Sequence, residues 1–381
     1  AVLTALIPSV VTGNWGYWVK TALTFLVISC PCALVLSVPL AFFAGIGLGS
    51  KKNVLFKGGS AMEAICNVKA IVMDKTGTLT RGVFTVQRIL PADGVSETEL
   101  LAMAAKCESA STHPIAQSIR AAAGERGVKT ERPESVQELS GLGIDADGIL
   151  CGNRKLLEQY GIAIPADDGA FGTEVLLADH SRYLGSIVIS DELKPETRTA
   201  IAALKAEGLK TVMLTGDNLP AARAMADELH LASFRAELLP GDKAGIIREL
   251  QADGTKVIAM VGDGINDAPA LAQADVGIAI GSGTDVAMES ADVVLMQSGL
   301  DEVPAAIELS RATMRIIREN LFWAFFYNAV GIPLAAGAFY ALLGWRLSPV
   351  VGAAAMAASS VTVVLNALRL RNIRLHRAGR K

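Results

Sequence analysis

Three short polar segments hold the residues of this 381-residue chain that could do chemistry. Asp74 precedes a loop that contains a glycine, so its carboxylate is exposed to a ligand and surrounded by backbone N–H donors. It could act as a covalent nucleophile that accepts a phosphoryl group. Asp263 offers the hard oxygen that suits Mg²⁺, Thr215 offers a hydroxyl, and Lys243 could neutralise phosphoryl charge. Turn-forming Asp and Gly residues would explain one such loop but not three. The segments are residues 74–80 (DKTGTLT), 215–217 (TGD) and 262–267 (GDGIND).

Alternating strands and helices must position these segments. The apolar run Val68–Met73 predicts a buried parallel strand directly before Asp74. The alternation predicts a doubly wound α/β sheet with its ligands at the carboxyl ends of the strands. From about Phe84 to Ser190 the alternation of apolar strands and helices is interrupted, which predicts an inserted second domain. The other expected elements are strands at Thr211–Leu214, Lys256–Val261, Val276–Ile280 and Asp292–Met296, and helices at Lys194–Gly208 and Asp242–Ala252.

The three segments together resemble the signature loops of the P-type ATPases, the last of them as GDGINDAP at 262–269. The resemblance implies a fold like that of haloacid dehalogenases, an inserted α+β nucleotide-binding domain, and use of ATP. It also implies an aspartyl phosphate on Asp74, with Mg²⁺ held by Asp74, the Thr76 carbonyl and Asp263. The catalytic residues that it implies are Asp74, Thr76, Thr215, Asp217, Lys243, Asn266 and Asp267.

The inserted stretch resembles the ATP-binding region of the heavy-metal branch of that family. Glycines let the backbone approach a base and ribose, and a neutral histidine can pack or hydrogen-bond against a nucleotide. Taken alone, a histidine before a proline more often begins a helix. The residues that the resemblance assigns to ATP are Glu108, His113, Gly141, Gly143, Gly152 and Asn153.

Apolar runs without any charge predict membrane spans. Thr21–Ser50, Leu321–Leu343 and Leu347–Leu368 each exceed the length of about 20 residues that a bilayer requires. Buried core helices are the alternative, and they fit shorter runs. Ala1–Val11 is too short to span and reads as the tail of a truncated helix. Basic residues flank the spans, so the body between the first two is predicted to be cytoplasmic. These residues are Lys51, Lys52, Arg311, Arg315, Arg318, Arg369, Arg371, Arg374, Arg377, Arg380 and Lys381.

A Cys-Pro-Cys sequence interrupts the first span. Pro31 removes a backbone hydrogen bond and is expected to kink the helix, which turns Cys30 and Cys32 towards one cavity. Paired thiols are soft ligands that select Cu(I), Zn²⁺ or Cd²⁺, although membrane cysteines are often only small apolar residues. The motif resembles the transport site of heavy-metal pumps. We interpret Cys66, Cys107 and Cys151 as structural.

The other spans favour Cu(I) over Zn²⁺ or Cd²⁺. Tyr327-Asn328 in the second span and Met356 with Ser360 in the third resemble the copper(I) branch, and Met356 and Ser360 share one helix face. Neither span contains a carboxylate or a lysine. A divalent ion in the membrane would need nearby counter-charge, and a monovalent ion would need less of it. The stretch 35–39 (VLSVP) through 82–84 (GVF) instead resembles the zinc/cadmium branch. Ordinary helix packing is an alternative role for the methionine and serine.

Composition limits the remaining possibilities. The mean hydropathy is +0.40 and the net charge is 35 − 38 = −3, which excludes nucleic-acid binding through bulk charge. An odd number of cysteines, five, argues against a secreted disulfide framework. An actuator domain with a Thr-Gly-Glu loop is expected to precede Ala1. The expected domains are 1–50 (truncated helix and Cys-Pro-Cys helix), 51–83 and 191–315 (phosphorylation), 84–190 (nucleotide binding), 316–370 (two spans) and 371–381 (basic tail).

Together these features predict a bacterial plasma-membrane pump that exports a heavy metal, with the bilayer and the metal ion as partners and a cytoplasmic metallochaperone as a candidate partner. The alternatives are a Zn²⁺/Cd²⁺/Pb²⁺ exporter, a soluble phosphatase of the same fold, which would not need the charge-free spans, and a metal sensor or storage protein, which would not need DKTGTLT.

Overall fold

A computed structural model gives the structure of the chain. It describes residues 1–30, 32–111, 113–139, 141–165, 172–239, 241–253, 257–281, 284–297, 299–336 and 348–373, apart from the side chains of Thr4, Cys32 and Ile265. The described residues divide into two compact units. The first contains residues 1–68, 292–297 and 302–373, and the second contains residues 69–291 and 299–301.

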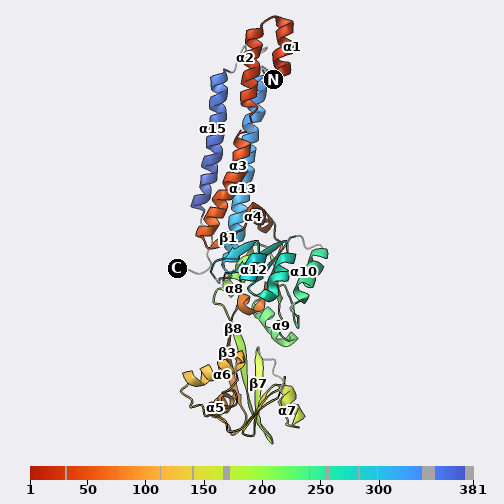
Figure 1. Cartoon of the computed structure of the whole chain (residues 1–381), viewed down its shortest axis with the longest axis vertical. Coiled ribbons are helices and arrows are strands. Elements are labelled where there is room, and N and C mark those ends of the chain that lie inside the picture. Colours follow the sequence, from red (N-terminus) through yellow and green to blue (C-terminus); the bar gives the residue numbers. More distant parts are fainter. Residues whose placement is uncertain are drawn as a thin grey trace. The chain divides into compact units, whose positions relative to one another are not determined.

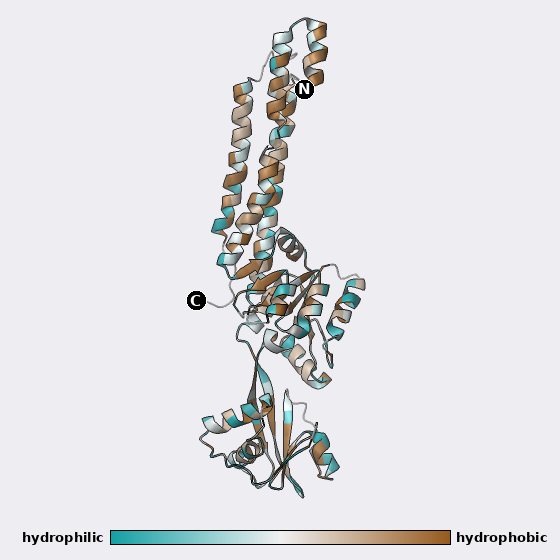
Figure 2. Cartoon of the chain, viewed as in Figure 1, coloured by the Kyte–Doolittle hydropathy of each residue, from teal (hydrophilic) through white to brown (hydrophobic). Residues whose placement is uncertain are grey.

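Apolar helices dominate the first unit (Figures 1 and 2). Gly13 adopts the left-handed conformation (φ 71°) that ends α1, and the chain turns back there into α2. The helices α3, α13 and α15 pack against one another. Large apolar side chains such as Phe43 and Phe322 remain exposed on them, as expected of helices that face lipid. The helices are α1 (Val2–Thr12), α2 (Trp15–Ile28), α3 (Cys32–Lys51), α4 (Gly59–Cys66), α13 (Glu302–Ala335), α15 (Pro349–Leu368) and the 3₁₀ turn η3 (Arg369–Asn372).

The first predicted span is interrupted near the expected proline kink. Helix α2 ends at Ile28 and α3 begins at Cys32, while Pro31 itself lies outside the described residues. Within the part of the chain that the structure describes, Trp15–Lys51 and Pro349–Asn372 are long and apolar enough to cross a membrane. The span expected at Leu321–Leu343 starts in α13 and runs into residues 337–347, which are not among those described.

Two differences from the expected boundaries have simple causes. Helix α13 begins at Glu302 and continues through the boundary expected at 315/316, because its amphipathic first half leads directly into the apolar run. The strand expected at Asp292–Met296 is β13 (Val293–Leu295). It pairs antiparallel with β1 (Val54–Phe56), with Val54 opposite Leu295, and β1 is a strand that was not expected.

Parallel strands form the centre of the second unit, in the order β12-β11-β2-β9-β10. Side chains from α10, α11 and α12 pack on one face of this sheet, where Val72, Met260 and Ile247 are buried together. The strands are β2 (Ala70–Asp74), β9 (Lys210–Leu214), β10 (Ser233–Arg235), β11 (Ile258–Gly262) and β12 (Val276–Ile280). The helices are α8 (Thr197–Ala206), α9 (Leu219–Glu228), α10 (Asp242–Ala252), α11 (Ala268–Gln273) and α12 (Asp285–Ser290), with turns η1 (Lys75–Leu79) and η2 (Ile265–Asp267).

An antiparallel sheet in the order β3-β8-β7-β6-β5-β4 forms the inserted region. Helices α5 and α6 pack on one face of it and α7 on the other, as the separate clusters around Leu177 and Leu176 show (Figure 1). The long strands β3 and β8 run through the boundaries expected at 83/84 and 190/191. The elements are β3 (Thr80–Pro91), β4 (Val136–Leu139), β5 (Gly143–Ala146), β6 (Ile149–Gly152), β7 (Thr173–Asp179), β8 (Arg182–Leu193), α5 (Glu97–Cys107), α6 (Pro114–Glu125) and α7 (Arg154–Gln159).

Candidate active site

The strand order brings the three polar segments to one edge of the parallel sheet. Asp74 is the last residue of β2, which lies between β9 and β11. The register pairs Asp74 with Leu214 and Met73 with Val261. Thr215 and Asp263 follow their strands by one residue each, so they emerge beside Asp74.

Lys243 joins two carboxylates at this edge. Its Nζ atom donates hydrogen bonds to Oδ1 of Asp74 and to Oδ1 of Asp267, each at 2.7 Å. The Oδ2 atom of Asp267 accepts from the backbone N–H groups of Asp263 at 3.3 Å and Gly264 at 3.4 Å. Lys243 and Asp267 are 7% and 1% exposed, so this network is nearly shielded from solvent. Asp267 therefore fixes both the loop after β11 and the lysine.

The carboxylates of this cluster repel one another. Burial, followed by the charge of Asp267, raises the pKa of Asp74 to about 6, while Lys243 partly opposes the rise. Burial and Asp267 likewise raise the pKa of Asp263. Burial alone would lower the pKa of Lys243, but Asp74 and Asp267 outweigh it and the pKa is raised. Oxygen atoms of Asp74, Asp263 and Asp267 lie within 4.8 Å of one another. Hard oxygen donors gathered in this way fit Mg²⁺, whose charge would relieve the repulsion.

Gly77 is required by the close approach of two loops. Its φ of +75° suits glycine, and a Cβ atom built on it would lie 1.7 Å from Oδ2 of Asp263. Only a residue without a side chain lets the loop after β2 pass this carboxylate. Thr76 and Asn266, the other residues predicted here, lie in the loops after β2 and β11 with exposed side chains.

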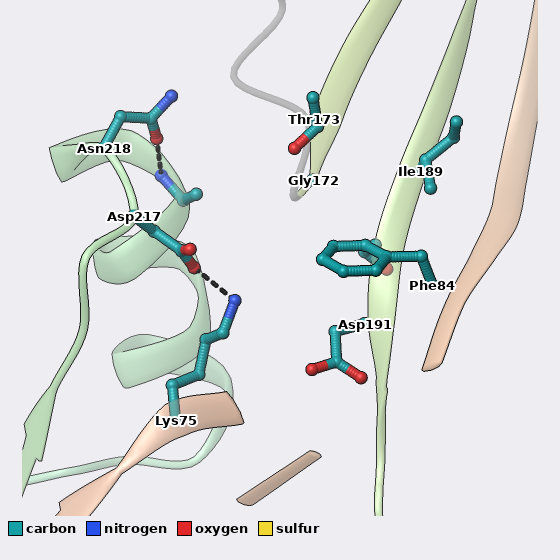
Figure 3. A pocket seen from close by; sticks show the side chains of 10 residues that line it. Lys75, Phe84, Gly172, Thr173, Ile189, Asp191, Asp217 and Asn218 are labelled. Carbon is teal, nitrogen blue, oxygen red and sulfur yellow. Dashed lines mark hydrogen bonds and ion pairs between the residues drawn. The ribbon is translucent and has the colours of Figure 1, made fainter. Parts of the chain in front are cut away.

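Asp217 pairs with Lys75 and not with the Asp74 cluster. The Nζ atom of Lys75 lies 2.6 Å from Oδ2 of Asp217, and the backbone N–H of Asp217 donates to Oγ1 of Thr215 at 3.1 Å. Figure 3 shows this ion pair on one side of a cavity of about 90 Å³, with Phe84 and Asp191 on the other.

Sequence reasoning assigned no role to Lys75, Asp191 and Lys194, which the structure buries close to the site. Lys194 donates through Nζ to the carbonyl of Gly77, and burial lowers its pKa. Thr80 donates to the carboxylate of Asp191. The available signal was the one that identified Asp74, because charged residues follow an apolar run. Lys75 comes directly after β2, Asp191 follows the run 187–189 within β8, and Lys194 comes directly after β8.

The six residues predicted to contact ATP all line one cavity of about 550 Å³ in the antiparallel region. Thr173 lines this cavity and the smaller one beside Asp217, so the two adjoin at the start of β7. The carboxylate of Glu108 is largely buried, and burial raises its pKa. The six are Glu108, His113, Gly141, Gly143, Gly152 and Asn153.

Several of these residues also have local structural roles. His113 caps α6 by accepting the backbone N–H of Ile115 at Nδ1 (3.2 Å), which leaves Nε2 as the protonated nitrogen of a neutral ring. Asn153 caps α7 and donates to the Gly141 carbonyl at 2.9 Å. Gly143 and Gly152 lie opposite each other in β5 and β6, and a Cβ atom on either would lie within 2.3 Å of a carbonyl oxygen. A capping role does not exclude contact with a nucleotide.

The residues proposed for the transported metal lie on helices that touch. Ile28, near the end of α2, contacts both Gly331 on α13 and Gly352 on α15, where an added Cβ atom would lie 2.8 and 2.9 Å from it. Gly331 follows Asn328 by three residues, and Gly352 precedes Met356 by four. Cys30, Tyr327, Asn328, Met356 and Ser360 are half-buried, and the Ser360 hydroxyl donates to the Met356 carbonyl at 3.3 Å. The Cys32 side chain is outside the described set.

The chain is similar in sequence to a family of hydrolases and to metal-exporting ATPases. Residues 68–275 match the haloacid dehalogenase-like hydrolase family. The chain is 46% identical over 360 residues to a probable copper-exporting P-type ATPase of Archaeoglobus fulgidus, a match that covers 92% of this chain and 44% of that protein. The chain thus spans about half the length of this curated relative.

Solved structures of heavy-metal ATPases also resemble this chain. A zinc-transporting PIB-type ATPase in the E2·Pi state superposes with a TM-score of 0.84 at 39% identity, covering 97% of this chain and 61% of that one. The catalytic domain of the CPx-ATPase CopB-B matches at 30% identity and a TM-score of 0.55, covering 69% of this chain and 98% of that domain. The chain therefore belongs to the haloacid dehalogenase-like hydrolases and, among them, to the heavy-metal (CPx) P-type ATPase family.

Proposed function

We propose that the complete protein is an ATP-driven pump of the plasma membrane that exports a heavy metal, Cu(I) in preference to Zn²⁺ or Cd²⁺. Its large nucleotide-using body is cytoplasmic, and its reaction passes through an aspartyl phosphate on Asp74. The observation that carries the proposal is the position of Asp74, at the end of β2 and within 2.7 Å of Lys243.

The chemistry is an in-line phosphoryl transfer. A carboxylate oxygen of Asp74 attacks the γ-phosphorus of ATP, and the bond from that phosphorus to the bridging oxygen breaks with its electron pair remaining on ADP. Lys243 and the hydroxyl of Thr215 hold the transferring group, so most of the catalysis is positioning and charge neutralisation. Mg²⁺, held by Asp74, Asp263 and the Thr76 carbonyl, would neutralise phosphate charge.

The nucleotide is proposed to reach this edge from the cavity lined by Glu108 and His113. That cavity adjoins the smaller one beside Asp217, which supports a nucleotide whose base lies in the cavity lined by Gly143 and Gly152 and whose phosphates extend towards Asp74. The ion pair between Lys75 and Asp217 would then border the path of the phosphates, and Lys75 adds positive charge there.

Cu(I) is the preferred cargo for a physical reason. Two thiolates with the thioether of Met356 and neutral oxygens carry little counter-charge, which suits a monovalent soft ion. The contact of Ile28 with α13 and α15 supports a site that Cys30 shares with Asn328 and Met356. The copper-exporting relative favours the same cargo, whereas the zinc-transporting structure keeps Zn²⁺ open as the alternative.

The proposal is tested by phosphoenzyme formation on the full-length protein with radiolabelled ATP. We expect Cu(I) to stimulate labelling more than Zn²⁺ or Cd²⁺, and Asp74→Asn to abolish it while metal binding at Cys30 and Cys32 persists. Stimulation by Zn²⁺ and not by Cu(I) would overturn the choice of cargo. Labelling independent of every metal would instead indicate a phosphatase-like activity.

A further inference from the structure

A pair of buried thiols lies beside the nucleotide cavity and has no role in the proposed function. Cys107 ends α5 and Cys151 lies in β6, and they are 1% and 0% exposed. The Cys107 thiol donates to the Ile149 carbonyl at 3.8 Å, and the Cys151 thiol donates to Oε1 of Glu108 at 4.0 Å. A hydrogen bond with Cys107, and then burial, raise the pKa of the Cys151 thiol. Cys107 thus contacts β6 two residues before Cys151, and both side chains belong to one buried cluster. A carboxylate of the nucleotide cavity adjoins the Cys151 thiol.

One member of the pair, Cys107, borders a cavity. Cys107 lines a cavity of about 330 Å³ together with Ser111 and His113, which also line the larger nucleotide cavity. Arg120 fixes the segment between α5 and α6 by donating to the carbonyls of Glu108 and Ser111. A change at the sulfur atoms would therefore be transmitted to residues that line both cavities.

The chemistry of the pair favours a soft cation over a disulfide. In a reducing cytoplasm, thiols such as these stay reduced. Two thiolates suit a monovalent thiophilic ion, which accepts few ligands and prefers sulfur. Binding releases both thiol protons to solvent and forms two metal–sulfur bonds, with no change in oxidation state.

We propose that Cys107 and Cys151 form a site for a soft monovalent cation, Cu(I) or its analogue Ag(I), and that its occupancy weakens nucleotide binding. With metal bound, the Cys151 thiol no longer donates to Glu108, and the end of α5 is drawn towards β6. The cargo of the pump would thus also act on its nucleotide cavity. The effect on nucleotide rests on the proposed function, whereas the metal stoichiometry does not.

The test uses the whole chain with Cys30→Ser, Cys32→Ser and Cys66→Ser, which leaves only the buried pair. Without oxygen, Ag(I) is the probe, intact mass gives the metal bound per chain, and a fluorescent ATP analogue gives nucleotide affinity. We expect one Ag(I) per chain. We also expect nucleotide binding weaker by about tenfold, which is the effect of Glu108 moving and losing one charged hydrogen bond to the nucleotide. Cys107→Ala and Cys151→Ala in this background should each lose both effects.

Several results would overturn the proposal: no Ag(I) bound, Ag(I) still bound in both alanine variants, or unchanged nucleotide affinity at full occupancy. A chain that loses hydrogen without gaining metal would show a disulfide instead. A thiolate-to-metal absorption band on the unsubstituted pair tests binding without relying on the folding of any variant. A chain that takes up Ag(I) but never binds nucleotide would contradict the proposed function and keep the metal site.

Discussion

Replacing Gly77 with alanine should separate the geometry of the candidate site from the stability of the fold. The added Cβ atom would lie 1.7 Å from Oδ2 of Asp263, so the carboxylate must move by more than an ångström to reach an ordinary contact. That movement changes the position of Asp263 relative to Asp74 and Asp267, whose oxygen atoms lie within 4.8 Å of it. A misplacement of about 1 Å can cost on the order of 10²-fold in rate. We therefore expect phosphoenzyme formation on the full-length protein to slow by about that factor.

Gly82→Ala is the matched control. Gly82 has a φ of +70°, similar to that of Gly77, but the atoms nearest to its added Cβ are backbone atoms of Gly77 at 3.9 Å. Both variants incur the left-handed penalty of about 1–2 kcal/mol, and Gly77→Ala adds the cost of displacing Asp263, so Gly82→Ala measures the effect of the backbone penalty alone. Rapid-quench labelling with ATP measures the rate of each. If Gly77→Ala is phosphorylated as fast as Gly82→Ala, the proposed role of Asp263 is wrong.

Further substitutions test the electrostatics and the helix packing. The pKa of Asp74 is about 6 in the folded chain, whereas that of an ordinary aspartate is about 3.8. Ionising Asp74 in metal-free protein therefore destabilises the fold by about 3 kcal/mol above pH 6. In chelator, Asp74→Asn should thus melt higher than the unsubstituted chain at pH 7.5, with the difference vanishing near pH 4. Lys243→Met leaves two buried carboxylates unpaired and should lower the free energy of unfolding by about 3 kcal/mol at neutral pH. The loss should be smaller at pH 5, where Asp74 is largely protonated. Equal losses at both pH values in denaturation curves would contradict this expectation. Ile28→Ala opens a cavity against Gly331 and Gly352 and should cost about 2–5 kcal/mol, whereas Leu23→Ala on the exposed face of α2 should cost much less.

The sheet and its active edge could be predicted because their signals are local. A buried parallel strand reads as a continuous apolar run, and its carboxyl end is marked by the first polar residue, as at Met73-Asp74. Parallel order then requires such ends to meet at one edge. Asp242–Ala252 was predicted with the bounds that α10 has, because charged residues flank its apolar stripe.

Pairings between distant segments could not be predicted. The antiparallel pairing of β13 with β1 depends on a three-residue strand too short to give a periodic signal. The ion pair of Lys75 with Asp217 joins residues 142 positions apart, and no local pattern selects that partner. The contact of the Cys151 thiol with Glu108 likewise arises only when α5 packs on β6.

The central claim is that the carboxylate of Asp74 becomes covalently phosphorylated, and the site of the modification tests it most directly. Full-length protein given ATP, Mg²⁺ and Cu(I) is quenched in acid and reduced with borohydride, which converts an aspartyl phosphate to homoserine, and its peptides are sequenced by mass spectrometry. The account predicts homoserine at position 74, absent from protein treated with hydroxylamine before reduction. Homoserine at another aspartate, or turnover of ATP with position 74 unmodified, would contradict it.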